Sequence, residues 1–165
     1  MNPIRTARHL LAEGRGRRHF PPRVLDAIQR AIAAAERRHR GQICFAIEGA
    51  LPLGALLRDA SARERAHEWF ARLRVWDTEH NCGVLIYVLV PDRAIEIVAD
   101  RGIAAQVRAD EWKSICTQMQ KSFAAGDFER GAVEGIAAVG ELLARHFPAD
   151  GGPRVNELPD RPVLL

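Results

Sequence analysis

The chain has 165 residues, of which 47% are hydrophobic and 27% are charged. This composition excludes a disordered or fibrous protein and indicates one globular domain with short tails. A chain of this length buries roughly 70% of the surface of its unfolded state, so it needs neither disulfides nor a structural metal to be stable. The net charge of +3 and the pI of about 9.1 raise the question of a nucleic-acid or membrane partner.

The positive charge is confined to one end of the chain. Residues 1–40 contain ten arginines and three acidic residues, whereas residues 41–165 carry a net charge of −4. The basic character therefore belongs to an N-terminal arm, residues 1–21, and to the first helix. The remainder of the chain is mildly acidic.

Cysteine spacing and hydropathy indicate the cellular compartment in which the protein resides. Cys44, Cys82 and Cys116 lie far apart in the chain and form no C-x-x-C motif. This pattern predicts neither a disulfide framework nor a zinc site and favours a reducing compartment. No apolar segment approaches the length of a membrane span, and the N-terminal residues lack the apolar region of a signal peptide. We therefore expect a cytoplasmic protein without a transmembrane segment.

The first helix and the first strand follow the arm. Residues 22–40 place apolar side chains at helical spacing, with Pro22 as the start signal and Gly41 as the stop signal. Residues 42–48 alternate in polarity, which predicts a strand. Residues 49–60 are rich in Gly, Pro and Leu and predict a connection that contains a short helical turn.

A second helix and two strands come next. Ser61 and Glu64 form a capping box that opens the helix. Residues 83–90 are almost wholly apolar, as in a strand covered on both faces, and residues 94–99 predict a third strand. The short link between the second and third strands predicts an antiparallel pair. The helix between the first and second strands predicts a parallel crossover.

Two more helices complete the predicted domain. They span residues 110–125 and 128–147 and are separated by Gly126. Residues 148–165 are rich in Pro and Gly and lack periodicity, which predicts a tail. The predicted fold class is α/β, a three-layer α/β/α sandwich in which helices flank a small mixed sheet. The domain occupies residues 22–147, between the arm and the tail.

Motifs of the common enzyme classes are absent from the sequence. There is no Walker A, G-x-S-x-G or S-x-x-K motif, and His67-Glu68 lacks the second histidine of a zinc protease. The sequence therefore indicates no organic cofactor and no catalytic nucleophile.

The predicted topology brings polar side chains to one edge of the sheet. The start of the first strand, the loop into the second and the exit of the third share that edge and carry Gln42, Asp77, Glu79, Asn81 and Asp100. Carboxylate and amide oxygens are preferred ligands of calcium, so this edge is a candidate site for a divalent cation. Alternatively, Asp77 and Glu79 are ordinary loop acids. Asp100 would then cap a turn or pair with Arg101.

Several short motifs occur in an order that resembles the TPM-domain family, of the thylakoid-lumen and LemA-associated type. They are Asn81-Cys82-Gly83-Val84-Leu85, Asp100-Arg101-Gly102-Ile103 and Gly126-x-Phe128-x-x-Gly131. The resemblance covers residues 22–147, points to a short bacterial branch and implies the same α/β/α fold.

The resemblance also implies two activities and a partner. Family members are described as calcium-binding and as acid phosphatases, and a membrane-associated protein of the LemA type is the implied partner. In the phosphatase hypothesis, a metal held by Asp100 activates water, and Arg101 neutralises the phosphoryl group. The chain departs from the family pattern at Cys82 and at Gln42, which stands where an acid is frequent. The amide oxygen of Gln42 can still coordinate a cation.

A third hypothesis assigns binding to the arm. Arg15, Arg17 and Arg18 would dock on an acidic protein, a nucleic acid or anionic lipid. Phe20 is the only Phe, Tyr or Trp in the arm, so any contact with nucleic acid would be nonspecific and salt-sensitive. The alternative is a solvated arm that confers solubility.

Overall fold

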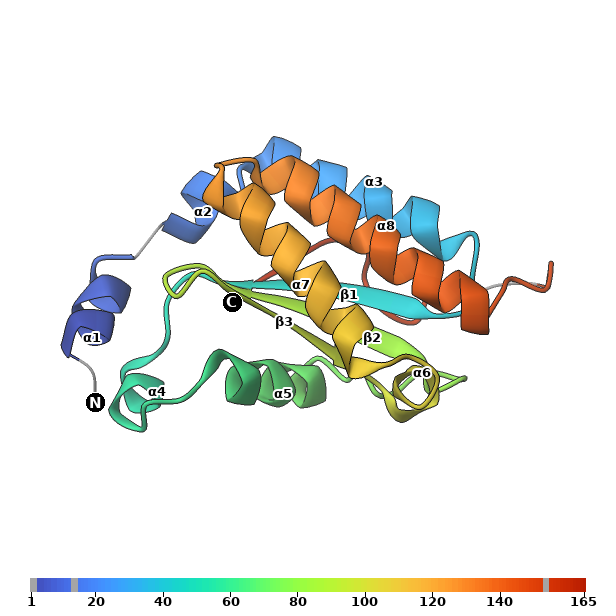
Figure 1. Cartoon of the computed structure of the whole chain (residues 1–165), viewed down its shortest axis with the longest axis horizontal. Coiled ribbons are helices and arrows are strands. Elements are labelled where there is room, and N and C mark those ends of the chain that lie inside the picture. The colour runs from blue at the N-terminus through green and yellow to red at the C-terminus, as the bar shows by residue number, and fades with distance from the viewer. Residues whose placement is uncertain (1–2, 13–14, 153–154) are drawn as a thin grey trace.

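The computed structural model describes residues 3–12, 15–152 and 155–165 and has a four-stranded mixed sheet between two layers of helices (Figure 1). The strands are β1 (Gln42–Glu48), β2 (Gly83–Leu89), β3 (Ala94–Ala99) and β4 (Val163–Leu164). Their order is β3-β2-β1-β4. β1 pairs in parallel with β2 and β4, and β2 pairs antiparallel with β3. The predicted sandwich and the directions of its first three strands are confirmed.

Helices cover both faces of the sheet. They are α1 (Pro3–Leu10), α2 (Arg15–His19), α3 (Pro22–Glu36), α4 (Leu53–Leu57), α5 (Ala62–Arg72), α6 (Arg101–Ala104), α7 (Ala109–Ala124) and α8 (Phe128–His146). Helices α3, α7 and α8 lie on one face, and α4 and α5 lie on the other (Figure 1). The capping box of Ser61 and Glu64 is present at the start of α5, as predicted.

Side chains of β1 alternate between two hydrophobic cores. Ile43, Phe45 and Ile47 belong to the core beneath α3, α7 and α8. Cys44 and Ala46 belong to the core that α4 and α5 cover. Because every residue of β1 is buried, this strand is the centre of the domain.

The first helix ends earlier than its periodicity predicts. It stops at Glu36 rather than at residue 40. The Arg40 N–H donates to the Phe147 carbonyl, and the Ala149 N–H donates to the Arg38 carbonyl, at 2.8 and 3.2 Å. These contacts with the segment after α8 replace the hydrogen bonds that would continue the helix.

The tail contributes a strand that the sequence does not predict. Val163 and Leu164 pair with Ala46 and Ile47, and the Leu165 N–H donates to the Ile47 carbonyl at 2.9 Å. A two-residue strand is too short to show a period. These residues form a strand because they pair with β1, whose backbone N–H and C=O groups on the side away from β2 need hydrogen-bond partners.

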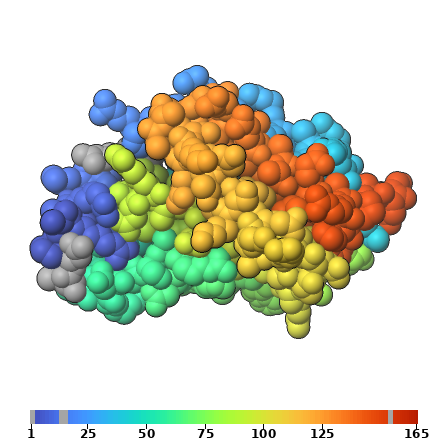
Figure 2. All heavy atoms as spheres, viewed as in Figure 1, coloured from blue at the N-terminus to red at the C-terminus, as the bar shows by residue number. Residues whose placement is uncertain are grey.

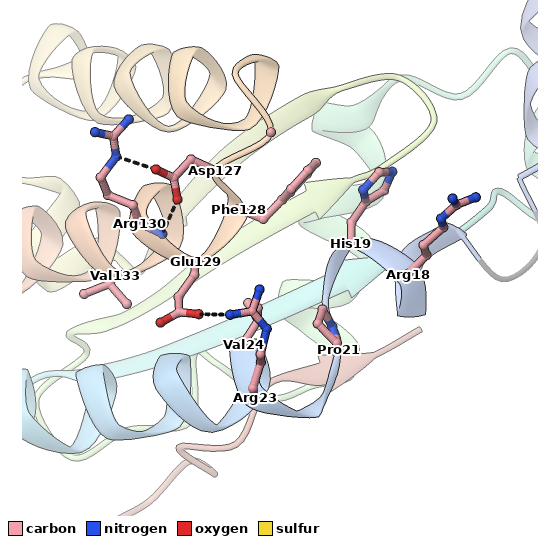
Figure 3. Close-up of a pocket in the computed structure, with 11 residues that line it drawn as sticks. Arg18, His19, Pro21, Arg23, Val24, Asp127, Phe128, Glu129, Arg130 and Val133 are labelled. Carbon is pink, nitrogen blue, oxygen red and sulfur yellow. Dashed lines mark hydrogen bonds and ion pairs between the residues drawn. The ribbon is translucent and has the colours of Figure 1, made fainter.

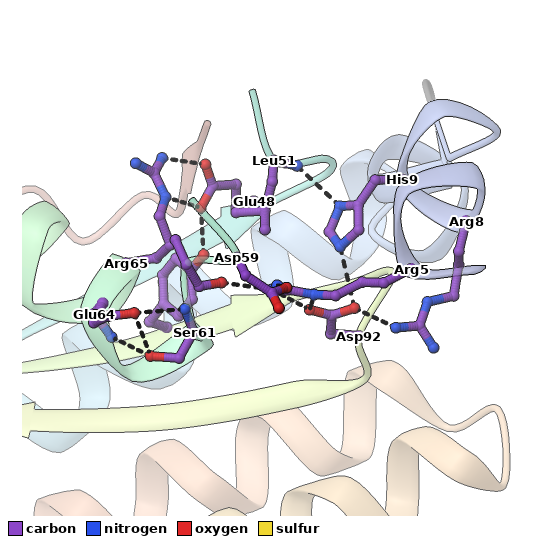
Figure 4. Close-up of polar contacts among 12 residues, drawn as sticks. Arg5, Arg8, His9, Glu48, Leu51, Asp59, Ser61, Glu64, Arg65 and Asp92 are labelled. Carbon is purple, nitrogen blue, oxygen red and sulfur yellow. Dashed lines mark hydrogen bonds and ion pairs between the residues drawn. The ribbon is translucent and has the colours of Figure 1, made fainter. Parts of the chain in front are cut away.

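Charged groups are buried at the far end of β1. Glu48, Arg65 and Tyr87 are each less than 5% exposed. The Arg65 guanidinium donates to the Glu48 carboxylate (Figure 4), and the Tyr87 hydroxyl donates to the same carboxylate. Burial and the hydrogen bond to Glu48 raise the pKa of Tyr87, which therefore donates as a neutral phenol. The network links α5 and β2 to β1.

Helix α1 is fastened to the turn between β2 and β3. Arg5, Arg8 and His9 all contact the Asp92 carboxylate, with His9 Nε2 at 3.1 Å (Figure 4). The Leu51 N–H donates to His9 Nδ1 at 3.0 Å. His9 therefore accepts at Nδ1 and donates from Nε2 to Asp92, which is the pattern of a neutral imidazole.

We expect this fastening of α1 to weaken as the pH falls. Burial lowers the pKa of His9 from its ordinary 6.5, so protonation begins to favour released α1 as the pH drops below that value. Burial opposes ionisation of Asp92, but Arg5 and His9 outweigh it and lower its pKa from 3.8. The stabilisation of docked α1 by ionised Asp92 is complete above pH 3.8, and it disappears as the pH falls through the lowered pKa.

Hydrogen-exchange protection factors of the α1 amides, measured between about pH 7 and pH 3, test this expectation. Protection should decline below about pH 6.5 and vanish in acid, and Asp92→Asn should remove much of it at neutral pH. Asp110→Asn, which removes an exposed carboxylate on α7, is the matched control. Constant protection of α1 across the range would contradict the assignment.

Candidate functional site

Three segments meet at the end of the sheet where β1 begins. The Gln42 N–H donates to the Cys82 carbonyl, and the Gly102 N–H donates to the Asn81 carbonyl at 2.9 Å. Gly83 and Gly102 let these segments approach one another closely. A Cβ on Gly83 would lie 1.9 Å from the Val75 carbonyl oxygen, and a Cβ on Gly102 would lie 2.5 Å from the Asn81 carbonyl oxygen. The topology thus brings together the backbone segments that carry the predicted cation ligands.

Asp100 is the buried carboxylate of this region. It is 8% exposed, and its Oδ1 accepts a hydrogen bond from the Arg101 N–H at 2.7 Å, which caps α6. Its Oδ2 is buried and has no hydrogen-bond partner among the described residues. The side chain of Arg101 is exposed. Of the two alternative roles expected for Asp100, the structure shows the cap, here of helix α6.

The other predicted oxygen ligands are not gathered around Asp100. Asp77 and Glu79 are exposed on the loop before β2. Asn81 is partly buried and has a φ of +50°, which turns the chain into β2. No three His, Cys, Asp or Glu side chains within residues 3–12, 15–152 and 155–165 are arranged to hold a metal ion. The segments meet, but the carboxylates do not form a cluster.

Gln42 has a different role from the predicted one. It is 1% exposed, and its Oε1 accepts hydrogen bonds from the N–H groups of Glu157 and Leu158 at 3.1 and 3.2 Å. Its amide oxygen is therefore engaged in holding the tail. The Glu157 carboxylate in turn accepts the Glu79 N–H at 3.0 Å. A carboxylate from the tail thus joins this edge, although no local pattern in the sequence predicts it.

An open hollow of about 480 Å³ lies beside the start of β1. Its lining includes Arg37, Arg40, Glu79, His80 and Asp150. Arg40 pairs with Asp150 at 3.2 Å, so part of the charge is neutralised within the hollow. Asp100 is not among the lining residues, which separates the hollow from the buried carboxylate.

The remaining candidate groups show no activated chemistry. Burial raises the pKa of the Cys44 thiol to about 12 and that of Cys82 to about 11, so both thiols are protonated at neutral pH. Arg17 and Arg18 are exposed on α2. The side chain of Arg15 lies outside the described residues. Within the described part of the chain, none of the helices combines the length and apolarity that crossing a membrane requires.

The fold and this edge define a class of α/β/α domain in which a β-hairpin follows a parallel crossover. A family model described as the TPM domain matches residues 20–142. The chain belongs to the TPM-domain family, as its motifs predicted.

A solved relative supports the same assignment. The structure is similar to the NMR structure of BA42 protein from the psychrophilic bacterium Bizionia argentinensis, with 31% sequence identity and a TM-score of 0.75. The similarity covers 87% of this chain and 93% of that chain. No curated protein sequence gave a significant match.

Replacing Gln42 by Met should loosen the tail, because the substitution keeps much of the side-chain volume and removes the acceptor. The N–H groups of Glu157 and Leu158 would lose their partner, at a cost of about 1–3 kcal/mol in the free energy of unfolding. Denaturant unfolding and amide exchange at residues 157–165 measure both effects. Gln118→Met, on the exposed face of α7, should leave stability and tail exchange unchanged. Equal behaviour of the two variants would contradict the anchoring role.

Proposed function

We propose that this TPM domain is a binding or accessory module that takes up a divalent cation, such as calcium, where β3 leads into α6. The observation that carries the proposal is the buried Oδ2 of Asp100, which lacks a partner. An unsatisfied buried carboxylate oxygen is unfavourable by about 1–3 kcal/mol or more. A bound cation would remove that penalty.

Backbone oxygens lie close to Gly102, two residues after Asp100, and are of the type that suits the same ion. The carbonyl oxygens of His80 and Asn81 lie 2.8 and 2.5 Å from the position of a Cβ built on Gly102. Calcium takes backbone carbonyls, carboxylates and water into a flexible shell of oxygens. In the proposal, Asp77 and Glu79 supply the exposed carboxylates of that shell through a movement of their loop. Gln42 is left out because its oxygen already accepts two N–H groups.

The phosphatase hypothesis depends on the same cation. Arg101 follows Asp100 directly and is exposed, so it is the residue that would meet a phosphoryl group. Because the metal would polarise the phosphoryl oxygen and activate water, a protein that binds no cation would lose this alternative as well.

Calcium titration of the intact protein tests the proposal. Millimolar calcium should shift the amide NMR resonances of residues 77–83 and 100–103 and raise the melting temperature, since a ligand that binds only the folded state stabilises it. Asp100→Asn should weaken binding at least tenfold and retain the helix cap, because Asn also caps helices. Glu134→Gln, at an exposed position on α8, should bind as the unmodified protein does.

Two results would overturn the calcium proposal. One is the absence of any shift at millimolar calcium. The other is a shift of the same size in Asp100→Asn, which would place the ion elsewhere.

A second candidate function is docking of the arm on an anionic membrane surface. Large apolar side chains are 59–78% exposed on and beside α1 and α4, at Ile4, Leu10, Leu11, Leu53 and Leu57. The two helices adjoin, because Arg5 of α1 donates to Asp59 and to the Ala60 carbonyl just after α4. Figure 2 shows α1, in dark blue, at one end of the molecule. We name this group of five side chains the α1–α4 apolar surface.

Basic side chains accompany the α1–α4 apolar surface. Arg58 is exposed directly after α4, Arg8 of α1 is exposed although it pairs with Asp92, and Arg17 and Arg18 follow on α2. Apolar side chains bordered by arginines are typical of segments that lie in the interface of an anionic bilayer. Among the acidic partners that the arm could take, this arrangement favours lipid.

Vesicle sedimentation tests the membrane hypothesis. The protein should bind vesicles of mixed phosphatidylglycerol and phosphatidylcholine, bind pure phosphatidylcholine vesicles weakly, and dissociate at high salt. The double change Leu10→Ser and Leu11→Ser should reduce binding several-fold, since it removes two apolar side chains from the surface. Val155→Ser, at a 74% exposed position in the tail, is the control. Equal binding of all three proteins would contradict the hypothesis.

A further inference from the structure

A hollow of about 400 Å³ lies at the end of the sheet opposite Asp100, and none of the functions above uses it. Val88, near the end of β2, and Val90, which follows the strand, line it on one side. Phe123, near the end of α7, and Phe128, at the start of α8, line it on the other. The volume falls in the range of small-molecule sites, and the walls are mainly apolar.

The aromatic walls of this hollow are held in place by their neighbours. The ring centroids of Phe123 and Phe128 lie 4.9 Å apart. Phe20, which is 1% exposed, packs edge-on against both rings at 5.8 and 5.5 Å. His19 stacks on Phe128 at 4.4 Å. A buried ring therefore supports both walls, so the cavity is formed before any ligand arrives.

The polar groups of the hollow are basic. Arg93, in the turn between β2 and β3, and His19, at the end of α2, both line it. The described lining residues include no carboxylate. Gln120 is the remaining polar side chain among them, and its amide approaches the Arg93 carbonyl at 3.5 Å. A ligand that fills the apolar part would thus meet a positively charged rim.

The neighbouring hollow differs in this respect. Its lining also includes His19 and Phe128, and two of its three arginines are paired with carboxylates (Figure 3). Arg23 contacts Glu129 at 3.6 Å, and Arg130 contacts Asp127 at 3.0 Å. That hollow therefore places two carboxylates beside its arginines, whereas no carboxylate lines the hollow at Arg93. An anionic ligand would meet no like charge in the hollow at Arg93, which favours that hollow as its site.

We propose that this hollow binds an apolar monocarboxylate, with an aliphatic or aromatic body between Phe123, Phe128 and Val88. The carboxylate would pair with Arg93, because a guanidinium and a carboxylate form paired, charge-assisted hydrogen bonds. The site is separate from the cation site, since Asp92 and Arg93 precede β3 and Asp100 follows it. It uses both the arm and the TPM domain, because His19 belongs to α2.

Titration of the intact protein with octanoate and with 2-naphthoate tests the proposal and distinguishes an aliphatic from an aromatic body. Amide NMR shifts should map to residues 88–93 and 120–128, with dissociation constants of about 1 mM or tighter. Octanol and 2-naphthol, which lack the charge, should bind at least tenfold more weakly than the corresponding acids.

Arg93 allows a substitution that leaves the turn intact. Its φ of +52° suits glycine, so Arg93→Gly should fold normally and lose at least tenfold in affinity for the acids. The alcohols should be unaffected. Arg74→Gly is the matched control, because Arg74 has a φ of +53°, is exposed and lies outside the hollow. It should bind both acids as the unmodified protein does.

A second variant tests the cavity itself. Ala124 is an exposed residue that lines the hollow, and Ala124→Trp should fill it and abolish binding of both acids. Circular dichroism checks that the variant is folded. Any of three results would overturn the proposal: no binding at about 1 mM ligand, shifts that map elsewhere, or an affinity of Arg93→Gly for the acids equal to that of the unmodified protein.

Discussion

The burial of β1 on both faces and along both edges is the constraint on which the rest of the structure depends. A central strand has no water to satisfy its polar groups, so partners must come from the protein. At its start, Gln42 accepts two N–H groups of the tail, and the Glu36 carboxylate accepts the Ile43 N–H at 2.7 Å. At its end, Glu48 pairs with Arg65. Leaving Glu48 without its partner would cost about 3–5 kcal/mol, which explains why α5 is fixed so closely to this strand.

The two ends of the sheet carry different chemistry for the same topological reason. Because β1 and β2 are parallel and β3 returns, the loop before β2 and the exit of β3 meet at one end, where Asp100 is buried. The β2–β3 turn lies at the other end, where Asp92 fastens α1 and Arg93 borders an apolar hollow. The proposed cation site and the proposed anion site therefore lie at opposite ends of the sheet.

Local patterns predicted the fold closely where they were long or chemically specific. The first and third strands begin and end at the predicted residues, and the capping box of Ser61 and Glu64 is present. The candidate site was predicted less well. Burial separates Asp100 from the exposed loop acids, and Gln42 is engaged by the tail. The local spacing of residues predicts neither the exposure of Asp77 and Glu79 nor the contact of Gln42 with residues more than a hundred positions away.

The sequence by itself determined the long helices, the first three strands, the α/β/α class and the family, because periodicity, caps and short motifs are local properties of the chain. It also located the acidic body and the basic arm. Only the tertiary structure decided that the tail adds a strand to β1 and that Asp92 fastens α1. It also decided that Asp100 keeps one oxygen without a partner. Those features depend on which distant groups share a desolvated space, and each is set by the need to satisfy buried polar atoms.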